Sequence, residues 1–227
     1  MMISGNKNTI SNIVPSIFLI GVLLGLILVF LGRLFVPATS FLSIAGACFI
    51  LIAYGLIGVF VFPHIQSKVL TPATIFGLFA GIIFASEILL EYALLPKDNS
   101  SWGIIEFGSV FVLYFLSGVW VAHRHKSIKN GVSAAVIAAM LSSVIWLIFV
   151  LITYYLFRGT TQQELVFKAE GNFQDFARSG MSDFNAFVME DFLGACFFHL
   201  SLTPIVAAIL GVIGGTLEKG FAKLRKH

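Results

Sequence analysis

Six long apolar stretches, separated by short polar segments, dominate this chain of 227 residues. Each approaches or exceeds the roughly 20 residues that a helix needs to cross the hydrocarbon core of a bilayer. The sequence lacks the strand-length alternation that a membrane β-barrel requires, so the spans are expected to be helices. The predicted spans run from about Val14 to Phe35, Phe41 to Phe62, Pro72 to Leu95, Trp102 to Ala122, Val132 to Phe157 and Phe192 to Leu217.

The polar segment between the fifth and sixth spans, residues 160–191, is too long for a simple connection. Apolar residues recur near a helical period over its second half, and Ser182 with Asp183 is typical of a capped helix start. Gly171 and Gly180 would interrupt a single helix. We expect one or two short amphipathic helices on the outer membrane surface, with a lid over the bundle as the alternative.

Composition supports the membrane class. Hydrophobic residues make up 58% of the chain and charged residues only 11%, whereas a soluble domain carries about 25% charged residues. The predicted fold is therefore all-α: a polytopic membrane protein, one domain over residues 1–227, with the lipid bilayer as its first partner. Cys48 and Cys196 lie inside apolar stretches without metal-type spacing, and are interpreted as buried thiols.

Charge predicts the orientation. Assigning alternate connections to opposite sides gathers most basic residues on one side, where Glu218 is the one acid. These basic residues are Lys7, Lys68, Arg124, Lys126, Lys129, Lys219, Lys223, Arg225 and Lys226. The connection over 158–191 is acidic overall, so the positive-inside rule predicts cytoplasmic N- and C-termini and an extracytoplasmic 160–191 segment, in the plasma membrane. Because the basic residues lie beside spans, the net charge of +3 does not indicate nucleic-acid binding.

Small residues predict how the helices pack. Glycines four residues apart occur in three spans, as Gly21 and Gly25, Gly77 and Gly81, and Gly211 and Gly215. Such pairs let helix backbones approach closely in lipid, and we expect contacts within the molecule rather than a dimer interface. On the third span Gly77, Glu87 and Glu91 share one face, which directs both acids into the bundle.

Ionisable residues within the spans are the candidate site, because each is costly in hydrocarbon unless it is paired or hydrated. The predicted binding residues are Glu87, Glu91, Glu106, Asp191, His199 and Arg33, all toward the outer side. Two neighbouring carboxylates disfavour double ionisation, so they must share a proton, pair with arginine or accept a cation. The alternative is that they hydrate at the interface and pair with arginine only to fix packing. Whether a metal ion binds stays open.

Pro204 interrupts the sixth span. It lacks an amide and displaces the carbonyl four residues earlier, that of Leu200. We expect an ordinary proline kink, partly compensated by Ser201 and Thr203. The alternative is a broken helix that lines a substrate cavity, with His199 at its mouth.

Enzyme motifs are missing from the sequence: it has no GxSxG, HExxH, Walker loop or Rossmann glycine fingerprint. We therefore predict no enzyme, no catalytic residue and no cofactor. The leading prediction is a small transporter or substrate-capturing membrane subunit for a proton, metal ion or cationic small molecule entering from the outer side. The alternative is a non-catalytic accessory or assembly subunit of a larger membrane complex, with protein partner subunits.

Overall fold

A computed structural model describes the main chain over residues 7–94 and 100–224, and side chains over 13–93 and 103–220. Within these ranges the chain forms helices and no strand, which confirms the all-α class. The elements are α1 (Lys7–Phe35), α2 (Phe41–Phe60), η1 (Phe62–His64), α3 (Ser67–Leu94), α4 (Ser100–His125), α5 (Ile128–Phe157), α6 (Thr161–Ala169), α7 (Asn172–Ser179) and α8 (Phe184–Leu224).

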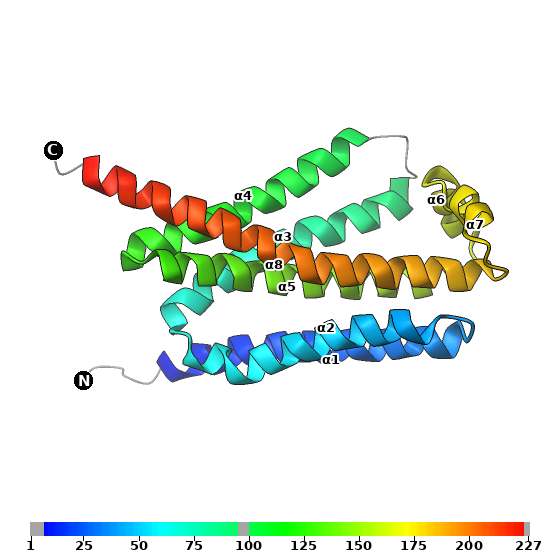
Figure 1. Ribbon diagram of the computed structural model, residues 1–227, viewed down its shortest axis with the longest axis horizontal. Helices are drawn as coiled ribbons and strands as arrows, with labels where there is room; N and C mark the ends of the chain where they lie inside the picture. Colours follow the sequence, from blue (N-terminus) through cyan, green and yellow to red (C-terminus); the bar gives the residue numbers. More distant parts are fainter. Residues whose placement is uncertain (1–6, 95–99, 225–227) are drawn as a thin grey trace.

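Six of these helices, α1 to α5 and α8, are long and apolar enough to cross a membrane. They correspond to the six predicted spans, and they indicate an integral membrane protein. The first turn of α1 and the last turn of α8 lie at the same end of the bundle, and α6 and α7 lie at the opposite end (Figure 1). The predicted end of the third span at Leu95 falls outside the described residues.

The last helix begins earlier than the sequence indicated. The predicted sixth span begins at about Phe192, whereas the helix that contains it, α8, begins at Phe184. The cap is Asp183 rather than Ser182: its Oδ1 accepts a hydrogen bond from the backbone N–H of Ala186 at 3.1 Å. Gly171 and Gly180 have φ values of +84° and +72°, and they separate α6, α7 and α8 as expected. The position of α6 and α7 on a membrane surface stays a prediction.

Helix α5 is the centre of the bundle, packed against α1, α3, α4 and α8. In its most apolar window 61% of residues are buried, compared with 28–39% in the other five membrane-length helices. The cause lies in its sequence, since the small residues Ala134, Ala135, Ala138 and Ala139 are completely buried and let neighbouring backbones approach.

Glycines fix the closest crossings. A Cβ added to Gly118 of α4 would lie 2.9 Å from the Cα of Gly211 on α8, and one on Gly131 of α5 would lie 2.6 Å from the carbonyl oxygen of Gly118. Likewise a Cβ on Gly77 of α3 would lie 2.7 Å from the carbonyl oxygen of Ala138. The predicted packing of glycines within the molecule is confirmed at these sites. From the three-glycine crossing, α4 and α8 diverge toward the α6–α7 end (Figure 1).

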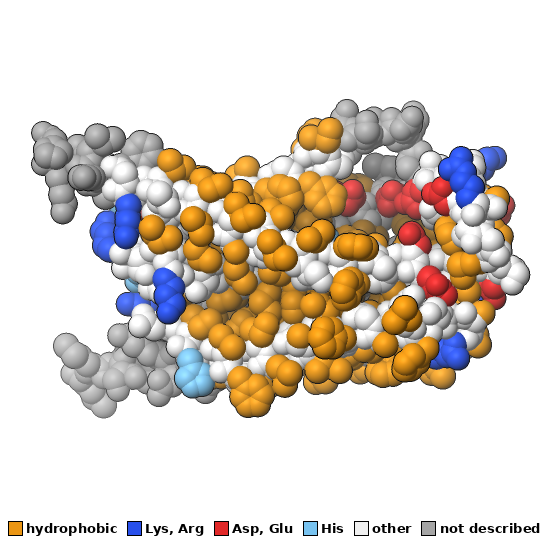
Figure 2. All heavy atoms as spheres, viewed as in Figure 1, with side chains coloured by type: hydrophobic (Ala, Val, Ile, Leu, Met, Phe, Trp, Pro, Cys, Tyr) orange, Lys and Arg blue, Asp and Glu red, His pale blue; other side chains and the backbone are white. Residues whose placement is uncertain are grey.

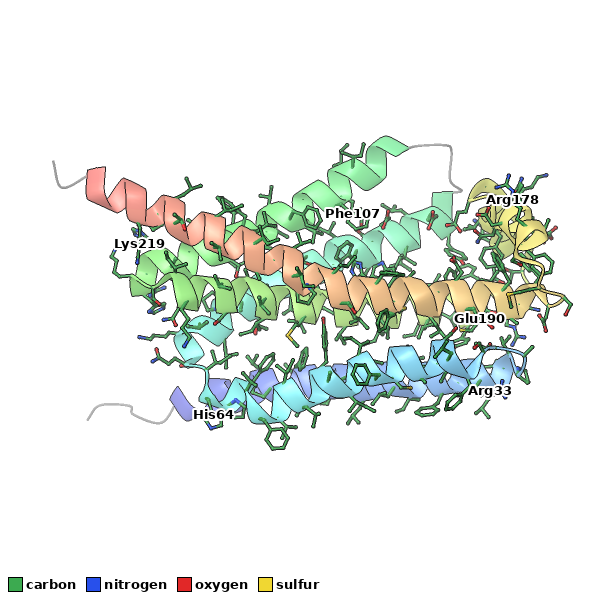
Figure 3. The ribbon with its side chains drawn as sticks, viewed as in Figure 1. Arg33, His64, Phe107, Arg178, Glu190 and Lys219 are labelled. Carbon is green, nitrogen blue, oxygen red and sulfur yellow. The ribbon has the colours of Figure 1, made fainter. Side chains whose placement is uncertain are left out.

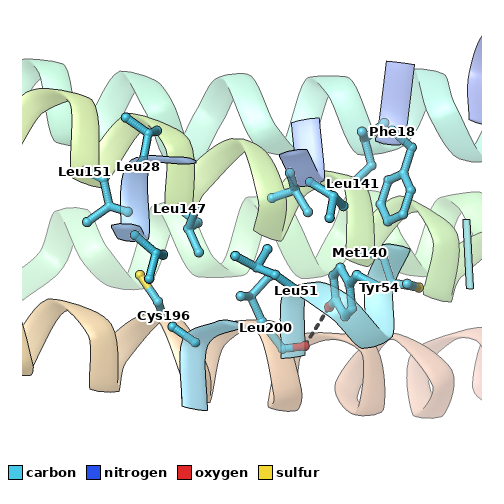
Figure 4. Packing of buried hydrophobic residues seen from close by; sticks show 14 of the residues in the cluster. Phe18, Leu28, Leu51, Tyr54, Met140, Leu141, Leu147, Leu151, Cys196 and Leu200 are labelled. Atoms are coloured by element: carbon cyan, nitrogen blue, oxygen red, sulfur yellow. Dashed lines mark hydrogen bonds between the residues drawn. The ribbon is translucent and has the colours of Figure 1, made fainter. Parts of the chain in front are cut away.

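The α1–α2 hairpin packs against α5 and α8 and forms a hydrophobic core with them (Figure 4). In this core the hydroxyl of Tyr54 on α2 donates a 2.6 Å hydrogen bond to the carbonyl oxygen of Leu200 on α8. This is the carbonyl that Pro204 cannot bind. A side chain from a different helix therefore satisfies it, rather than Ser201 or Thr203 alone as the sequence suggested.

Candidate functional site

Acidic side chains gather at the α6–α7 end of the bundle, and lysine and arginine side chains predominate at the other end (Figure 2). Figure 3 locates individual charged residues at the two ends: Arg33, Arg178 and Glu190 lie at the α6–α7 end, and Lys219 and His64 lie at the opposite end. The charge sorting expected from the sequence is therefore present along the long axis of the molecule.

Five acids from four elements follow one another in what we call the acidic column. It consists of Glu106, Glu87, Glu91, Glu170 and Asp191. Glu106 of α4 lies within hydrogen-bonding reach of Glu87 on α3. One turn along α3, Glu91 is within the same reach of Glu170, which follows α6. Asp191 of α8 is close enough to Glu170 to influence it electrostatically. The structure thus brings together four predicted site residues and adds Glu170.

Helix packing explains why the glutamates at the inner end of the column face the interior of the bundle. Phe84, fully buried one turn before Glu87, holds this face of α3 against the bundle, and Glu87 and Glu91 follow it on the same face. On α4, Val110 is fully buried four residues after Glu106, which turns the glutamate inward as well.

Glu106 is the most unusual member of the column. It is only 7% exposed, and neither carboxyl oxygen has a hydrogen-bond partner among the described residues. Two ionised carboxylates only accept hydrogen bonds, so the contact with Glu87 becomes a bond only when one of them carries a proton to donate. Burial of an unpaired carboxylate is costly, which favours a shared proton or a bound cation at this point.

Glu170 connects the column to the polar segment. Asn172 Nδ2 donates a 3.2 Å hydrogen bond to Glu170 Oε2. The side chain of Glu170 is exposed, yet neighbouring protein atoms remove part of its hydration, and this desolvation is the main reason that its pKa is raised. The charges of Asp191 and Glu87 raise the pKa further. The hydrogen bonds from Glu91 and Asn172 act in the opposite direction. Glu170 therefore holds its proton to higher pH than a glutamate in water.

Two amides hold α6 over this end of the bundle. Gln162 Nε2 donates to the carbonyl oxygen of Tyr92 at the end of α3. The buried Gln163 Nε2 donates to the carbonyl oxygen of Tyr154 on α5 at 3.2 Å. These bonds position Glu170 beside Glu91, because Glu170 is the residue that ends α6.

His199 lies deeper, at an aromatic cavity between α3, α4, α5 and α8. Its ring stacks on Trp146 with centroids 4.3 Å apart, and it meets the edge of Phe84 at 4.8 Å. Its Nε2 is buried and has no hydrogen-bond partner among the described residues. The cavity measures about 450 Å³, and His199 and Thr203 are the polar side chains in its lining.

Arg33 occupies a different place from the column. Its guanidinium donates to the carbonyl oxygens of Pro37 and Thr39, in the connection between α1 and α2. Glu190 binds the same connection, since its Oε1 accepts a 2.8 Å hydrogen bond from the backbone N–H of Ser40. Arg33 and Glu190 thus fix the α1–α2 turn to α8, and the structure does not bring Arg33 together with Glu87.

Within the described residues, no group of three histidine, cysteine, aspartate or glutamate side chains has the arrangement of a metal site. The column is a line of paired carboxyls rather than a converging set of ligands. Its chemistry is that of groups that exchange protons or pair with a positive charge.

Comparison of the chain with models of protein families, with curated proteins and with solved structures finds no match in any of the three.

Proposed function

We propose that this chain is a small transporter or substrate-capturing membrane subunit, whose acidic column binds a proton or, in its place, a cation. The observation that carries the proposal is Glu106, a buried carboxyl that has no hydrogen-bond partner among the described residues and that faces a second carboxyl. In hydrocarbon such a pair must hold a proton or a positive charge. The position of the column at one end of the bundle supports entry from that end (Figure 2).

The charge distribution supports the orientation. By the positive-inside rule the lysine-rich end faces the cytoplasm, with both termini, and the α6–α7 end faces outward from the plasma membrane. In this orientation α6 and α7 are an amphipathic cover at the outer surface. Glu170 and Asp191 then lie at the entrance, and Glu87 and Glu106 are the innermost members of the column.

The accessory-subunit alternative relied on glycine faces and on the outer amphipathic helices as surfaces for other proteins. The paired glycines Gly77, Gly81, Gly211 and Gly215 instead approach α5 of this chain.

Proton release on cation binding tests the proposal. Protein in nanodiscs of neutral lipid is placed in weakly buffered solution with a pH indicator. Sodium, magnesium, zinc, tetramethylammonium and benzyltrimethylammonium are added separately. At saturation, at least one cation should release about one proton per chain, because a cation beside the pair favours the ionised carboxylate.

Glu106→Gln has nearly the same shape and no ionisable proton, so it should release none. Glu164→Gln, which changes an exposed acid of α6 outside the column, should behave as the unmodified protein. The proposal is overturned if none of the cations releases a proton, or if Glu106→Gln releases as many protons as the unmodified chain. Retained helicity and elution volume would establish that the variant is folded.

A further inference from the structure

The aromatic cavity adjoins the acidic column on the side away from α6 and α7. Phe84 lines it, and Glu87 follows three residues later on the same helix, which is a rise of about 4.5 Å. On α4, Phe107 lines the cavity and is adjacent in sequence to Glu106. The Phe84 and Phe107 rings meet edge to face with centroids 5.7 Å apart. Neither Glu87 nor Glu106 is part of the cavity lining, but Glu87 lies one turn along α3 from Phe84, on the same face of the helix.

Aromatic rings make up most of the cavity wall. Besides Phe84 and Phe107, the rings of Phe111, Trp146 and Phe198 line it. In Figure 3 Phe107 is labelled in the space between α4 and α8, where the two helices diverge. Aromatic faces attract positive charge as well as apolar groups, and aromatic cages are a recurrent solution for quaternary ammonium ligands.

We infer that this cavity binds the apolar body of an organic ammonium ion whose positive charge lies against Glu87 and Glu106. The inference rests on the proposed function and names its substrate class. Carboxylates next to an aromatic wall complement both parts of such a molecule.

The volume of the cavity and the nearby carboxyls favour an organic ammonium ion. The cavity measures about 450 Å³, which is within the range of small-molecule sites and enough for one aromatic ring with a short substituted amine. A membrane lipid is the competing occupant of an apolar cavity. Its acyl chain would leave the carboxyls and His199 unpartnered, and its phosphate would be repelled by the column.

Three related compounds separate charge from apolar contact. Benzyltrimethylammonium has a ring and a charge, tetramethylammonium has the charge alone, and neopentylbenzene has the same shape as the first without charge. Binding of the two cations is measured by calorimetry in nanodiscs, and neopentylbenzene is tested as a competitor. Benzyltrimethylammonium should bind about tenfold more tightly than tetramethylammonium, because its ring is buried in the cavity. Neopentylbenzene should not compete.

Phe107→Leu tests the aromatic wall with little risk to folding, since this side chain is 43% exposed. It should weaken benzyltrimethylammonium binding about fivefold, because the contact between the Phe107 ring and the benzyl ring is lost. Tetramethylammonium has no ring and should lose less affinity. Phe197→Leu is the matched control, because this similarly exposed α8 residue lies outside the cavity lining.

The outcomes distinguish the inference from the proposed function. Equal affinity for the two cations, with proton release intact, would reject the aromatic cavity and retain the acidic column. Competition by neopentylbenzene would also reject the inference, because it would identify a site for any apolar molecule. Equal weakening by Phe107→Leu and Phe197→Leu would do the same. Loss of proton release with every cation would remove both proposals.

Discussion

The two ends of the α4–α8 pair differ in nearly every property. At the end away from α6 and α7, the helices cross on glycines, and Gly118 and Gly211 touch backbone to backbone. At the other end the helices diverge (Figure 1), and phenylalanines of both helices line the cavity there. The same pair of helices is therefore closed at one end and open at the other, and the size of the side chains along each helix accounts for the difference.

This contrast shows how a short membrane protein separates stability from binding. In lipid, close backbone approach supplies much of the attraction between helices. Concentrating that attraction at one crossing leaves the other end free to hold groups that pack poorly, such as Glu106 and His199. Both have buried polar atoms without a partner among the described residues. Fully packed helices would have no room for a ligand beside those atoms.

A large side chain at the glycine crossing should have the largest effect on stability. Gly118→Leu would force α4 away from Gly211 and Gly131, with an expected loss of more than about 3 kcal/mol of stability. The measurement is the thermal melting of detergent-purified protein, together with its yield. Gly108→Leu on the same helix is the control, because no atom lies within 4 Å of a Cβ added there. Similar melting of the two variants would show that the crossing is not the stabilising contact.

A smaller effect is expected between the crossing and the cavity. The buried hydroxyls of Tyr114 on α4 and Ser142 on α5 form a 2.5 Å hydrogen bond. Tyr114→Phe should lower stability by about 1 kcal/mol, the typical net contribution of such a bond. Ser142→Ala should lower it similarly, and the double variant should lose less than the sum. Additive losses in the same melting experiment would contradict a direct bond.

The smallest effect should be local and dependent on pH. Because the pKa of Glu170 is raised in the folded chain, its contact with α3 is complete at acidic pH. The contact is lost as pH rises through that raised value. Ionised Glu170 would then face Glu91 and Glu87 on α3 and Asp191 on α8.

Hydrogen exchange of the α6 amides measures this loosening. Exchange should be a few-fold faster in the unmodified chain than in Glu170→Gln at a pH above the raised pKa of Glu170, and equal in the two at acidic pH. Comparing the two proteins at each pH removes the intrinsic pH dependence of exchange. A constant ratio across the range would show that Glu170 does not control the attachment of α6.

Much of this architecture could be predicted from the sequence. Apolar stretches of membrane length locate six helices, and the glycine spacing identifies helix faces that pack within the molecule. The start of α8 was misplaced because Glu190 and Asp191 interrupt the apolar pattern of a helix that is continuous through them. Hydropathy marks where a helix enters lipid, which need not be where the helix begins.

The candidate site was only partly predictable. Helical spacing placed Glu87 and Glu91 on an inward face, but the contact with Glu170 depends on how α6 folds back over α3. Residue spacing in a polar segment carries no signal for that. The aromatic cavity was also missed, since its rings come from four helices and apolar residues are abundant throughout the chain.

The hydrogen bond from Tyr54 to Leu200 joins residues 146 positions apart. The gap that Pro204 leaves in one helix is thus closed by a phenol from the first hairpin. Deleting this hairpin, or replacing it with two unrelated apolar helices, would leave the carbonyl oxygen of Leu200 without its hydrogen-bond donor. A replacement hairpin would have to place a hydrogen-bond donor where the Tyr54 hydroxyl lies. The first two helices and the last helix are therefore coupled in sequence.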